Sequence, residues 1–369
     1  MNKSNPENQT KEFVTTHSVI NADSRNLSFL KSSSIHCVVT SPPYPMIAMW
    51  DTLFSSLNKE IEYALDISNG KSAFELMHLE LEKTWQELER VLVPGGFVCI
   101  NIGDAVRTVG GLFRLYPNHS RIEMCFHSLG FEVLPRIIWQ KTTNAPNKFM
   151  GSGMLPAGAY VTLEHEYILI FRKPGKREFT TPQEKSRRRQ SAVFWEERNR
   201  WYADIWTDRG VKQKLDFGQR ELRSRSAAFP FDIAARLIHM YSLTGDMICD
   251  PFTGTGTTQV AALALGRNSV GMELDTELVQ HARLLLTGSL GSAQQYAESR
   301  MQNHIDFITE HSSAGKELKY VNGAYGFPVK TQQEQELVIP WLERIEETDD
   351  RVTGSYGWRA KRIKELFLL

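Results

Sequence analysis

The run Thr40-Ser41-Pro42-Pro43-Tyr44 follows a short β-branched stretch and carries residue types suited to holding an amino group. The two prolines fix an extended backbone and remove two donors, so carbonyl oxygens remain free to accept hydrogen bonds. An exocyclic amino group of a base donates two hydrogens, and Ser41 Oγ and the Pro42 carbonyl would accept one each. The ring of Tyr44 would stack on a base swung out of a helix. Taken alone, Ser-Pro-Pro is better interpreted as a rigid turn, so the assignment needs a second motif.

A glycine-rich loop in the segment ICDPFTGTGTT supplies that second motif. A buried strand ends at Asp250, Gly254 and Gly256 allow a ligand to approach the backbone, and a helix begins directly after them. Glu273 stands at the end of the next strand, where an acid binds ribose hydroxyls in nucleotide sites. Dinucleotide sites usually have a third glycine, which is Gln259 here. Asp250 suits a cationic amino-acid moiety better than a pyrophosphate. The two acids argue against a turn without a ligand.

The two motifs together resemble a known family of enzymes. TSPPY is similar to the catalytic motif of amino-methylating DNA methyltransferases, and DPFTGTGTT is similar to their S-adenosylmethionine motif. AAFPFDIAARLI resembles the family segment that covers the cofactor, and NADSRNLSFL resembles the element in which an acid, here Asp23, contacts the cofactor's adenine. The catalytic motif precedes the cofactor motif, as in the permuted class called beta. The resemblance spans roughly residues 15–285.

The resemblance implies a set of site residues. Those expected to hold the target base are Ser41, Pro42, Pro43 and Tyr44. Those expected around the cofactor are Asp23, Phe229, Pro230, Asp250, Pro251, Phe252, Gly254, Gly256, Thr257 and Glu273. Asp104, at the end of VLVPGGFVCINIGD, either lines the site or is a solvated strand-end acid.

The methylated atom is expected to be an amino nitrogen. Methylation of cytosine C5 needs a thiolate, in that family from a Cys after Pro, and none of the four cysteines here follows Pro. In the resembled family, Ser at the first motif position is mostly associated with cytosine N4 and Asp with adenine N6. Ser41 therefore favours N4 of cytosine in duplex DNA, with adenine N6 as the alternative. The expected role is the modification component of a restriction-modification system, acting beside a cognate endonuclease or alone.

Residues 172–225 carry 16 Lys and Arg against 8 Asp and Glu, with seven aromatic residues interleaved. This composition favours a folded target-recognition region over a solvated linker, because a linker does not explain the aromatic residues. The side chains expected to contact DNA are Arg187, Arg188, Arg189, Arg198, Arg200, Lys212 and Lys214.

The elements that position these residues alternate between strands and helices, which predicts an α/β fold. Apolar spacing predicts a helix over 72–92 and another near 122–129, and buried strands near 35–40 and 246–250. The resemblance implies a Rossmann-like, doubly wound, mostly parallel seven-stranded sheet with permuted motif order, closed by a hairpin that includes EHEYILIFRKP. The expected domains are a catalytic half (13–171), the recognition region (172–225), a cofactor-binding half (226–288) and a C-terminal extension (289–369).

The composition of the chain limits the kinds of surface, metal site and location that can be expected. The 369 residues are 41% hydrophobic and carry 43 basic and 43 acidic residues, so a nucleic-acid surface must be local. Cysteine spacing predicts no metal site, and the thiols are expected to be buried in a reducing compartment. The chain lacks the apolar runs of a membrane helix or signal peptide, which favours a prokaryotic cytoplasmic protein acting on DNA, as a monomer or homodimer.

Two other enzyme classes are weighed against this interpretation. A nicotinamide-dinucleotide dehydrogenase would explain the glycine loop and Glu273 but leaves TSPPY and the basic region unused. Methyltransferases of protein glutamine or RNA usually begin the catalytic motif with Asn and place the cofactor loop first. Ser41 and the motif order count against them.

Overall fold

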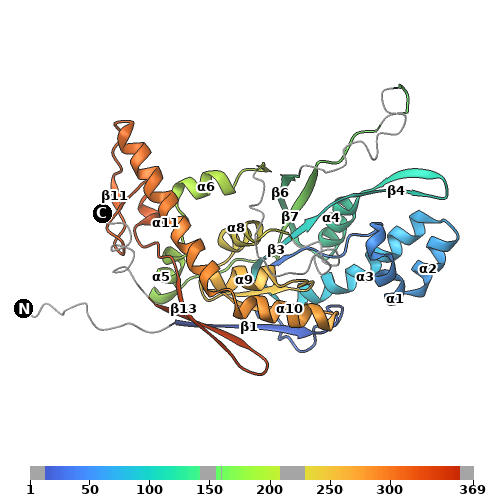
Figure 1. Cartoon of the computed structure of the whole chain (residues 1–369), viewed down its shortest axis with the longest axis horizontal. Helices are drawn as coiled ribbons and strands as arrows, with labels where there is room; N and C mark the ends of the chain where they lie inside the picture. Colours follow the sequence, from blue (N-terminus) through green and yellow to red (C-terminus); the bar gives the residue numbers. More distant parts are fainter. Residues whose placement is uncertain (1–12, 142–154, 159, 208–228, 358–369) are drawn as a thin grey trace, which may run out of the picture.

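The computed structural model describes residues 13–141, 155–158, 160–207 and 229–357, which form one large mixed sheet with helices on both faces (Figure 1). In spatial order the ten strands of this sheet are β13 (Trp341–Glu347), β14 (Val352–Gly357), β1 (Phe13–Asn21), β10 (Asn268–Glu273), β9 (Met247–Asp250), β2 (Ile35–Thr40), β3 (Leu92–Ile102), β7 (His165–Arg172), β6 (Glu132–Gln140) and β8 (Ile205–Trp206). Two hairpins stand apart from it: β4 (Ala105–Val109) with β5 (Leu112–Tyr116), and β11 (Tyr320–Val321) with β12 (Pro328–Val329).

The expected doubly wound sheet is confirmed. The neighbours β1, β10, β9, β2 and β3 pair in parallel, and β7 runs antiparallel to both β3 and β6 as the expected closing hairpin. These seven strands are the predicted core. The sequence did not reveal that β8 extends one edge and that β14 and β13 extend the other.

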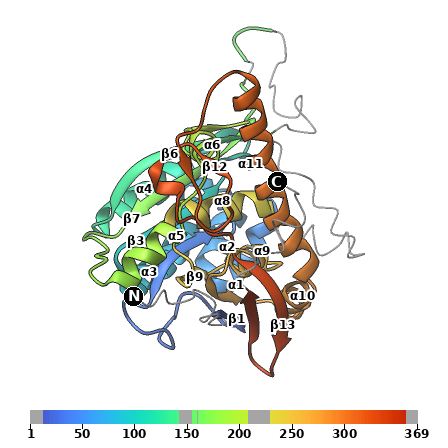
Figure 2. The same ribbon diagram turned by 90° about the vertical axis from the view of Figure 1, so that its left-hand side faces the viewer.

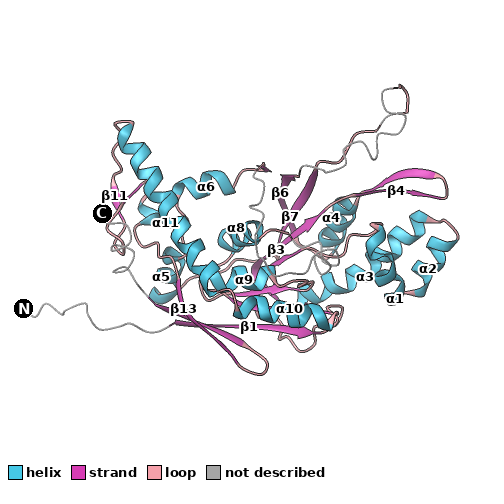
Figure 3. Ribbon diagram, in the orientation of Figure 1, coloured by secondary structure: helices cyan, strands magenta, loops and turns pink. Residues whose placement is uncertain are grey.

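The helices cover the two faces of this sheet (Figure 3). Their bounds are α1 (Asp51–Leu57), α2 (Lys59–Asp66), α3 (Gly70–Val91), α4 (Asn118–Ser128), α5 (Pro182–Gln190), α6 (Trp195–Trp201), α8 (Phe231–Tyr241), α9 (Thr257–Ala264), α10 (Thr276–Thr287) and α11 (Leu290–Ser313). Short 3-10 turns occur at Ala48–Trp50 and Gln332–Glu334. None of the helices in the described part of the chain is long and apolar enough to cross a membrane.

Alternation along β2 shows how the two faces are filled. Val38 belongs to the core formed with α3 and α4, and Val39 to the core formed with α8 and α9. Successive side chains of a strand point to opposite faces, so a strand buried on both sides is apolar throughout. This explains why IHCVV shows no polar alternation. All four cysteines are buried and free, as the apolar runs around Cys37, Cys99 and Cys249 predict for those three.

The longest predicted helix has the expected position. It is α3, which begins after Asn69 rather than at residue 72, because the Asn69 side chain accepts a hydrogen bond from Ser72 N (3.1 Å) and caps the first turn. Phe74, Met77, Leu81, Trp85 and Leu88 are buried along one face of this helix.

The C-terminal extension and the recognition region share a hydrophobic core. Phe194 of the recognition region packs in one cluster with Met301 of α11 and with Tyr325, Phe327 and Leu337. Figure 2 shows α11 running along the edge of the molecule beside these segments. These contacts therefore join two parts of the chain that the sequence predicts as separate domains. Lys212 and Lys214, which are expected to contact DNA, lie outside the described residues.

A buried ion pair ties α6 to α11. The Arg300 guanidinium donates to both carboxylate oxygens of Glu197 (Nε to Oε1 2.6 Å, Nη2 to Oε2 2.7 Å). The two side chains are only 5% and 7% exposed. Rings of Phe194 and Trp201 lie 5.8 Å from the guanidinium carbon. The bidentate geometry offsets the free-energy cost of removing both charges from water. Loss of one partner is costly because the other charge would stay buried without a partner.

We expect Arg300→Met to lower the free energy of unfolding by about 3–5 kcal/mol, because Glu197 would remain buried without its partner. Denaturant unfolding followed by circular dichroism measures this change. Arg351→Met is the matched control, since Arg351 is 61% exposed and surface ion pairs contribute about 1 kcal/mol or less. Equal effects of the two substitutions would contradict a special role for the buried pair.

Candidate active site

A cavity of about 550 Å³ opens at the carboxyl ends of the parallel strands. Its walls come from residues just after β1, β2 and β9 and at the end of β10. The chain connections run in opposite directions from β9 and β2, which are neighbours, so this is the switch point of the sheet. Ligands of open α/β sheets bind at such crevices because adjacent loops diverge there. The volume is typical of small-molecule sites.

Most of the predicted site residues meet in this cavity. Those that line it are Asp23, Ser41, Pro42, Pro43, Phe229, Pro251, Phe252, Gly254, Thr257 and Glu273. Four predicted residues do not line it: Tyr44, Pro230, Asp250 and Gly256. Residues from motifs more than 200 positions apart thus surround one space, because β2 and β9 are paired in the sheet.

The glycine loop has the backbone conformation that only glycine adopts readily. Gly254 has φ 52° and Gly256 has φ 87°, both in the left-handed region. A Cβ on Gly256 would also lie 2.9 Å from the Cβ of Ala282 in α10. Gly256 caps α9, so its role here is close packing of loop and helix. Gly254 N donates to Glu273 Oε2 (2.9 Å), which brings loop and acid together at the cavity.

Asp250 stabilises the glycine loop from within the protein. Its carboxylate is buried and accepts hydrogen bonds from Thr40 Oγ1 (2.6 Å) and Phe252 N (3.1 Å). Burial raises the pKa of this carboxyl to about 6 in spite of these donors. Since Thr40 directly precedes Ser41, the Thr40–Asp250 bond joins the two motifs of the sequence.

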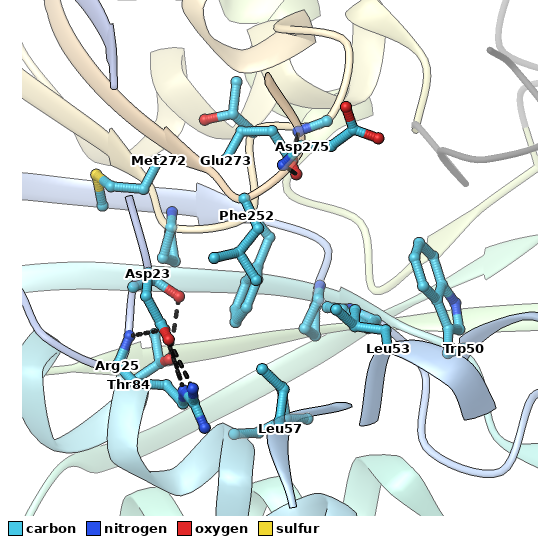
Figure 4. A pocket seen from close by; sticks show the side chains of 18 of the residues that line it. Asp23, Arg25, Trp50, Leu53, Leu57, Thr84, Phe252, Met272, Glu273 and Asp275 are labelled. Atoms are coloured by element: carbon cyan, nitrogen blue, oxygen red, sulfur yellow. Dashed lines mark hydrogen bonds and ion pairs between the residues drawn. The ribbon is translucent and has the colours of Figure 1, made fainter. Parts of the chain in front are cut away.

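Two acidic residues, Asp23 and Glu273, lie at different places on the cavity wall (Figure 4). Asp23 pairs with Arg25 (2.7 Å), which also contacts Glu80 (2.6 Å). Burial opposes its charge, but the hydrogen bonds and charge of Arg25 lower the pKa of Asp23. Burial raises the pKa of Glu273. Figure 4 shows the Phe252 side chain between these acids and the helical wall of Leu53 and Leu57.

The catalytic motif ends in a hydrogen-bonded network. Ser41 Oγ donates to the Tyr44 hydroxyl (3.3 Å), which donates to Glu166 Oε2 (3.1 Å). Asn101 Nδ2 donates to both the Tyr44 hydroxyl (2.8 Å) and Glu166 Oε2 (2.7 Å). Tyr44 is only 8% exposed, and burial, reinforced by the charge of Glu166, raises the pKa of its hydroxyl well above the usual range. Stacking of its ring on a base stays a prediction.

A family model of DNA methylases, the N6_N4_Mtase family, matches residues 35–284. The chain belongs to this family. Over 325 residues it is 52% identical to the Type II methyltransferase M.MthZI of Methanothermobacter thermautotrophicus, covering 88% of this chain and 90% of the relative. It is 48% identical to the Type II methyltransferase M.MjaI of Methanocaldococcus jannaschii, covering 72% and 90%. A solved putative DNA modification methylase of Thermus thermophilus, complexed with S-adenosyl-L-methionine, is 32% identical, with a TM-score of 0.57 over 73% and 93% of the two chains.

The five predicted DNA-contacting residues that the structure of the methylase describes do not line this cavity. Arg187 lies 3.6 Å from Asp246, at the amino end of β9, which is the sheet edge opposite Ser41. Arg189 pairs with Glu336 (2.7 Å), and Arg188 lies over the Phe179 ring. Arg198 and Arg200 are exposed on α6. Contact of any of these with DNA stays a prediction.

A second cavity of the methylase, of about 980 Å³, lies at that opposite edge. None of the described residues that line it is acidic, and its basic lining residues are Arg172, Lys176, Arg177, Arg188 and Arg198. Positive charge is therefore concentrated at this second cavity. In a chain with zero net charge, a surface that binds anions must depend on such a local concentration.

Other residues at the methylase site carried little signal in the sequence. The wall formed by Trp50, Leu53 and Leu57 lies in a stretch without a motif, and only the fold places it on the same cavity as Phe252. Glu166 had a usable signal, because it stands at the start of the apolar strand YILIF. Asp104 does not line the cavity; it accepts hydrogen bonds from His119 N and Nδ1 (3.1 and 2.8 Å) at the start of α4. No group of three or more potential metal ligands occurs among the described residues.

Proposed function

We propose that this DNA methylase transfers a methyl group from S-adenosylmethionine to N4 of cytosine at a specific sequence in duplex DNA. One observation carries the proposal: Ser41 and Pro42, which suit an amino group, line the same cavity as Phe252, Gly254 and Glu273, which suit the cofactor. The related Thermus methylase complexed with S-adenosyl-L-methionine supports the cofactor assignment.

The cavity residues fit the cofactor chemically. Glu273 presents a carboxylate whose oxygens accept from Gly254 N and Asp275 N (2.9 and 3.0 Å), and ribose hydroxyls would donate to the same group. Gly254 has no side chain to obstruct approach to the loop, and Phe252 offers an apolar surface. Asp23 would accept from the adenine, and Phe229 and Pro230 would cover the ligand. The bound cofactor supplies a methyl group on a sulfonium, which an amine attacks in line.

Ser41 and the Pro42 carbonyl would orient the amino group rather than deprotonate it first. A serine hydroxyl is too weakly basic at neutral pH, so the proton leaves after the nitrogen has become cationic. Positioning then carries most of the rate enhancement. Attack by a thiolate on the ring is disfavoured here, since all four cysteines are buried and none of them lines the cavity. Burial also raises the pKa of Cys99 and of Cys249 well above the usual range, and that of Cys125 to about 12.

Cytosine N4 is preferred to adenine N6 because Ser41 stands at the first motif position, where Ser is mostly associated with cytosine N4 in the resembled family and Asp with adenine N6. The family match covers both reactions, and adenine N6 is the other outcome of the test below. We also propose that the exposed arginines of the recognition region contact DNA phosphates together with two lysines; these residues are Arg188, Arg198, Arg200, Lys212 and Lys214. Arg187 and Arg189 are less suited to this contact because each is paired with an acidic residue within the protein. The Type II names of the relatives support a role beside a cognate restriction endonuclease.

Mass spectrometry of digested product DNA tests the proposal. Unmethylated duplex DNA is incubated with the protein and S-adenosylmethionine and is then hydrolysed to nucleosides. We expect N4-methylcytosine. N6-methyladenine would overturn the assignment of the base but leave the enzyme class standing, and no methylated nucleoside on DNA of varied sequence would overturn the proposed function. NADH binding in place of S-adenosylmethionine binding would favour the dehydrogenase alternative.

A further inference from the structure

The network behind Ser41 joins the ends of four segments. Ser41 and Tyr44 follow β2, Asn101 lies near the carboxyl end of β3, and Glu166 lies at the start of β7. Lys141 directly follows β6, and its ammonium contacts Glu166 Oε1 (2.5 Å). Because β7 runs antiparallel to β3, its first residues reach the same sheet edge as the last residues of β3. The antiparallel closing strand thus delivers a carboxylate to the back of the catalytic motif.

The direction of every hydrogen bond in this network is determined by Glu166. A carboxylate only accepts, so the Tyr44 proton is directed to Glu166 Oε2 and the Asn101 amide group must also point its NH2 there. The Tyr44 oxygen accepts hydrogen bonds from Asn101 Nδ2 and from Ser41 Oγ. Tyr44 has no proton left to donate to Ser41. In the hydrogen bond between the two hydroxyls, Ser41 is therefore the donor and Tyr44 the acceptor. The lone pairs of the Ser41 oxygen remain free.

The free lone pairs are what an amino group requires. Ser41 lines the cavity, so its oxygen can accept a hydrogen from the exocyclic nitrogen without competing as a donor. Each bond in a chain that ends on a charge polarises the next, so the Ser41 oxygen is a stronger acceptor than an isolated hydroxyl. Burial raises the pKa of Tyr44 well above the usual range, so Tyr44 stays protonated and the chain keeps its direction.

We propose that Glu166 is a positioning residue for methyl transfer: through Tyr44 it makes Ser41 a hydrogen-bond acceptor and provides the negative charge that a neutral serine lacks. This inference rests on the proposed function, since it concerns the same amino group. It assigns the acid of the catalytic centre to β7 rather than to the motif after β2. Glu166 has no contact with substrate in this scheme and acts only through Tyr44 and Ser41.

The burial of the network suits this role. Asn101 is 2% exposed, and the Glu166 side chain is 16% exposed, whereas Lys141 is 44% exposed. Lys141 therefore contacts the outer oxygen of Glu166 from the solvent side, and Tyr44 and Asn101 contact the inner one. A hydrogen bond to a partly buried charge is stronger than one between neutral groups.

Two substitutions break the chain at different bonds. Glu166→Gln keeps the shape but removes the charge and lets an NH2 group face Tyr44, and Tyr44→Phe keeps the ring but removes the hydroxyl. We expect each to lower the single-turnover methylation rate by about tenfold to a hundredfold, the range for loss of a hydrogen bond to a charged group. The affinities for S-adenosylmethionine and for duplex DNA should change less than about twofold, because Glu166 contacts neither.

The double variant Tyr44→Phe/Glu166→Gln separates positioning from general damage. If Glu166 acts only through Tyr44, the double variant is as slow as the slower single variant, whereas independent effects multiply. Glu166→Asp keeps the charge and should recover part of the rate. Glu164→Gln is the matched control, because Glu164 is exposed two residues earlier and carries the same charge. It should retain wild-type turnover.

The wild-type protein decides first whether the proposed function holds, since methylation of duplex DNA must be present before any variant is compared. With that activity present, full turnover of Glu166→Gln overturns the inference. Multiplicative losses in the double variant, or a weakened affinity for DNA that accounts for the loss, also overturn it. If Glu166→Gln does not fold, Tyr44→Phe alone decides: an unchanged single-turnover rate overturns the inference, and a loss with unchanged affinities supports it.

Discussion

Replacing Ser41 with alanine is expected to lower the single-turnover rate of DNA methylation by about a hundredfold to a thousandfold, as loss of one aligned hydrogen-bonding group in an active site does. The Kd for S-adenosylmethionine should stay within about twofold. The alanine variant lacks the oxygen that would accept from the amino group, but it leaves Phe252, Gly254 and Glu273 in place around the cofactor cavity. Rapid-quench methylation with labelled cofactor measures the rate, and calorimetry measures the Kd.

Ser128→Ala is a matched control for this change. Ser128 is an exposed serine on α4 whose hydroxyl donates to Met124 O (2.9 Å), and it does not line the cavity. Its replacement should leave turnover unchanged. Wild-type turnover of Ser41→Ala would remove Ser41 from the catalytic centre, and with it the explanation offered here for the choice of cytosine N4.

Replacing Gly254 with valine is expected to raise the Kd for S-adenosylmethionine by about a hundredfold or more. Gly254 has φ 52°, where a β-branched residue is strained by about 1–3 kcal/mol. The new side chain would also enter the cavity that Gly254 lines, and the shifted backbone would lose its bond to Glu273 (2.9 Å). Calorimetric titration with the cofactor measures the effect, because binding itself is lost and not only turnover.

Gly111→Val separates cavity obstruction from backbone strain. Gly111 has φ 77° in the turn between β4 and β5, and no atom lies within 4 Å of an added Cβ. This variant should lose some stability but bind the cofactor with wild-type affinity. Equal loss of affinity in both variants would mean that Gly254 acts through folding rather than through the cofactor site.

The cavity could be anticipated from the sequence because its residues belong to short local patterns. Ser41 follows a β-branched strand, Gly254 follows another, and Glu273 ends a third. Parallel strands place their carboxyl ends at one edge, so local patterns of this kind converge once the sheet forms. The same reasoning did not show that Asp250 and Tyr44 lie beside the cavity rather than on its wall. A residue at the right position in a motif can point into the protein, and the hydrogen bonds of Asp250 to Thr40 and Phe252 are with backbone and side chains that no spacing reveals.

The sequence by itself determined where the main strands and helices of the α/β core lie and which two loops carry the motifs, because apolar periodicity and glycine positions are local properties. The doubly wound sheet was implied by the family resemblance that those motifs carry. Only the tertiary structure decided which side chains meet across that framework. It brought Glu166 behind Ser41, packed Phe194 among residues of the C-terminal extension, and paired Arg187 with Asp246 away from the cavity. These contacts join segments far apart in the chain, and side-chain partners of that kind depend on strand direction and packing rather than on spacing.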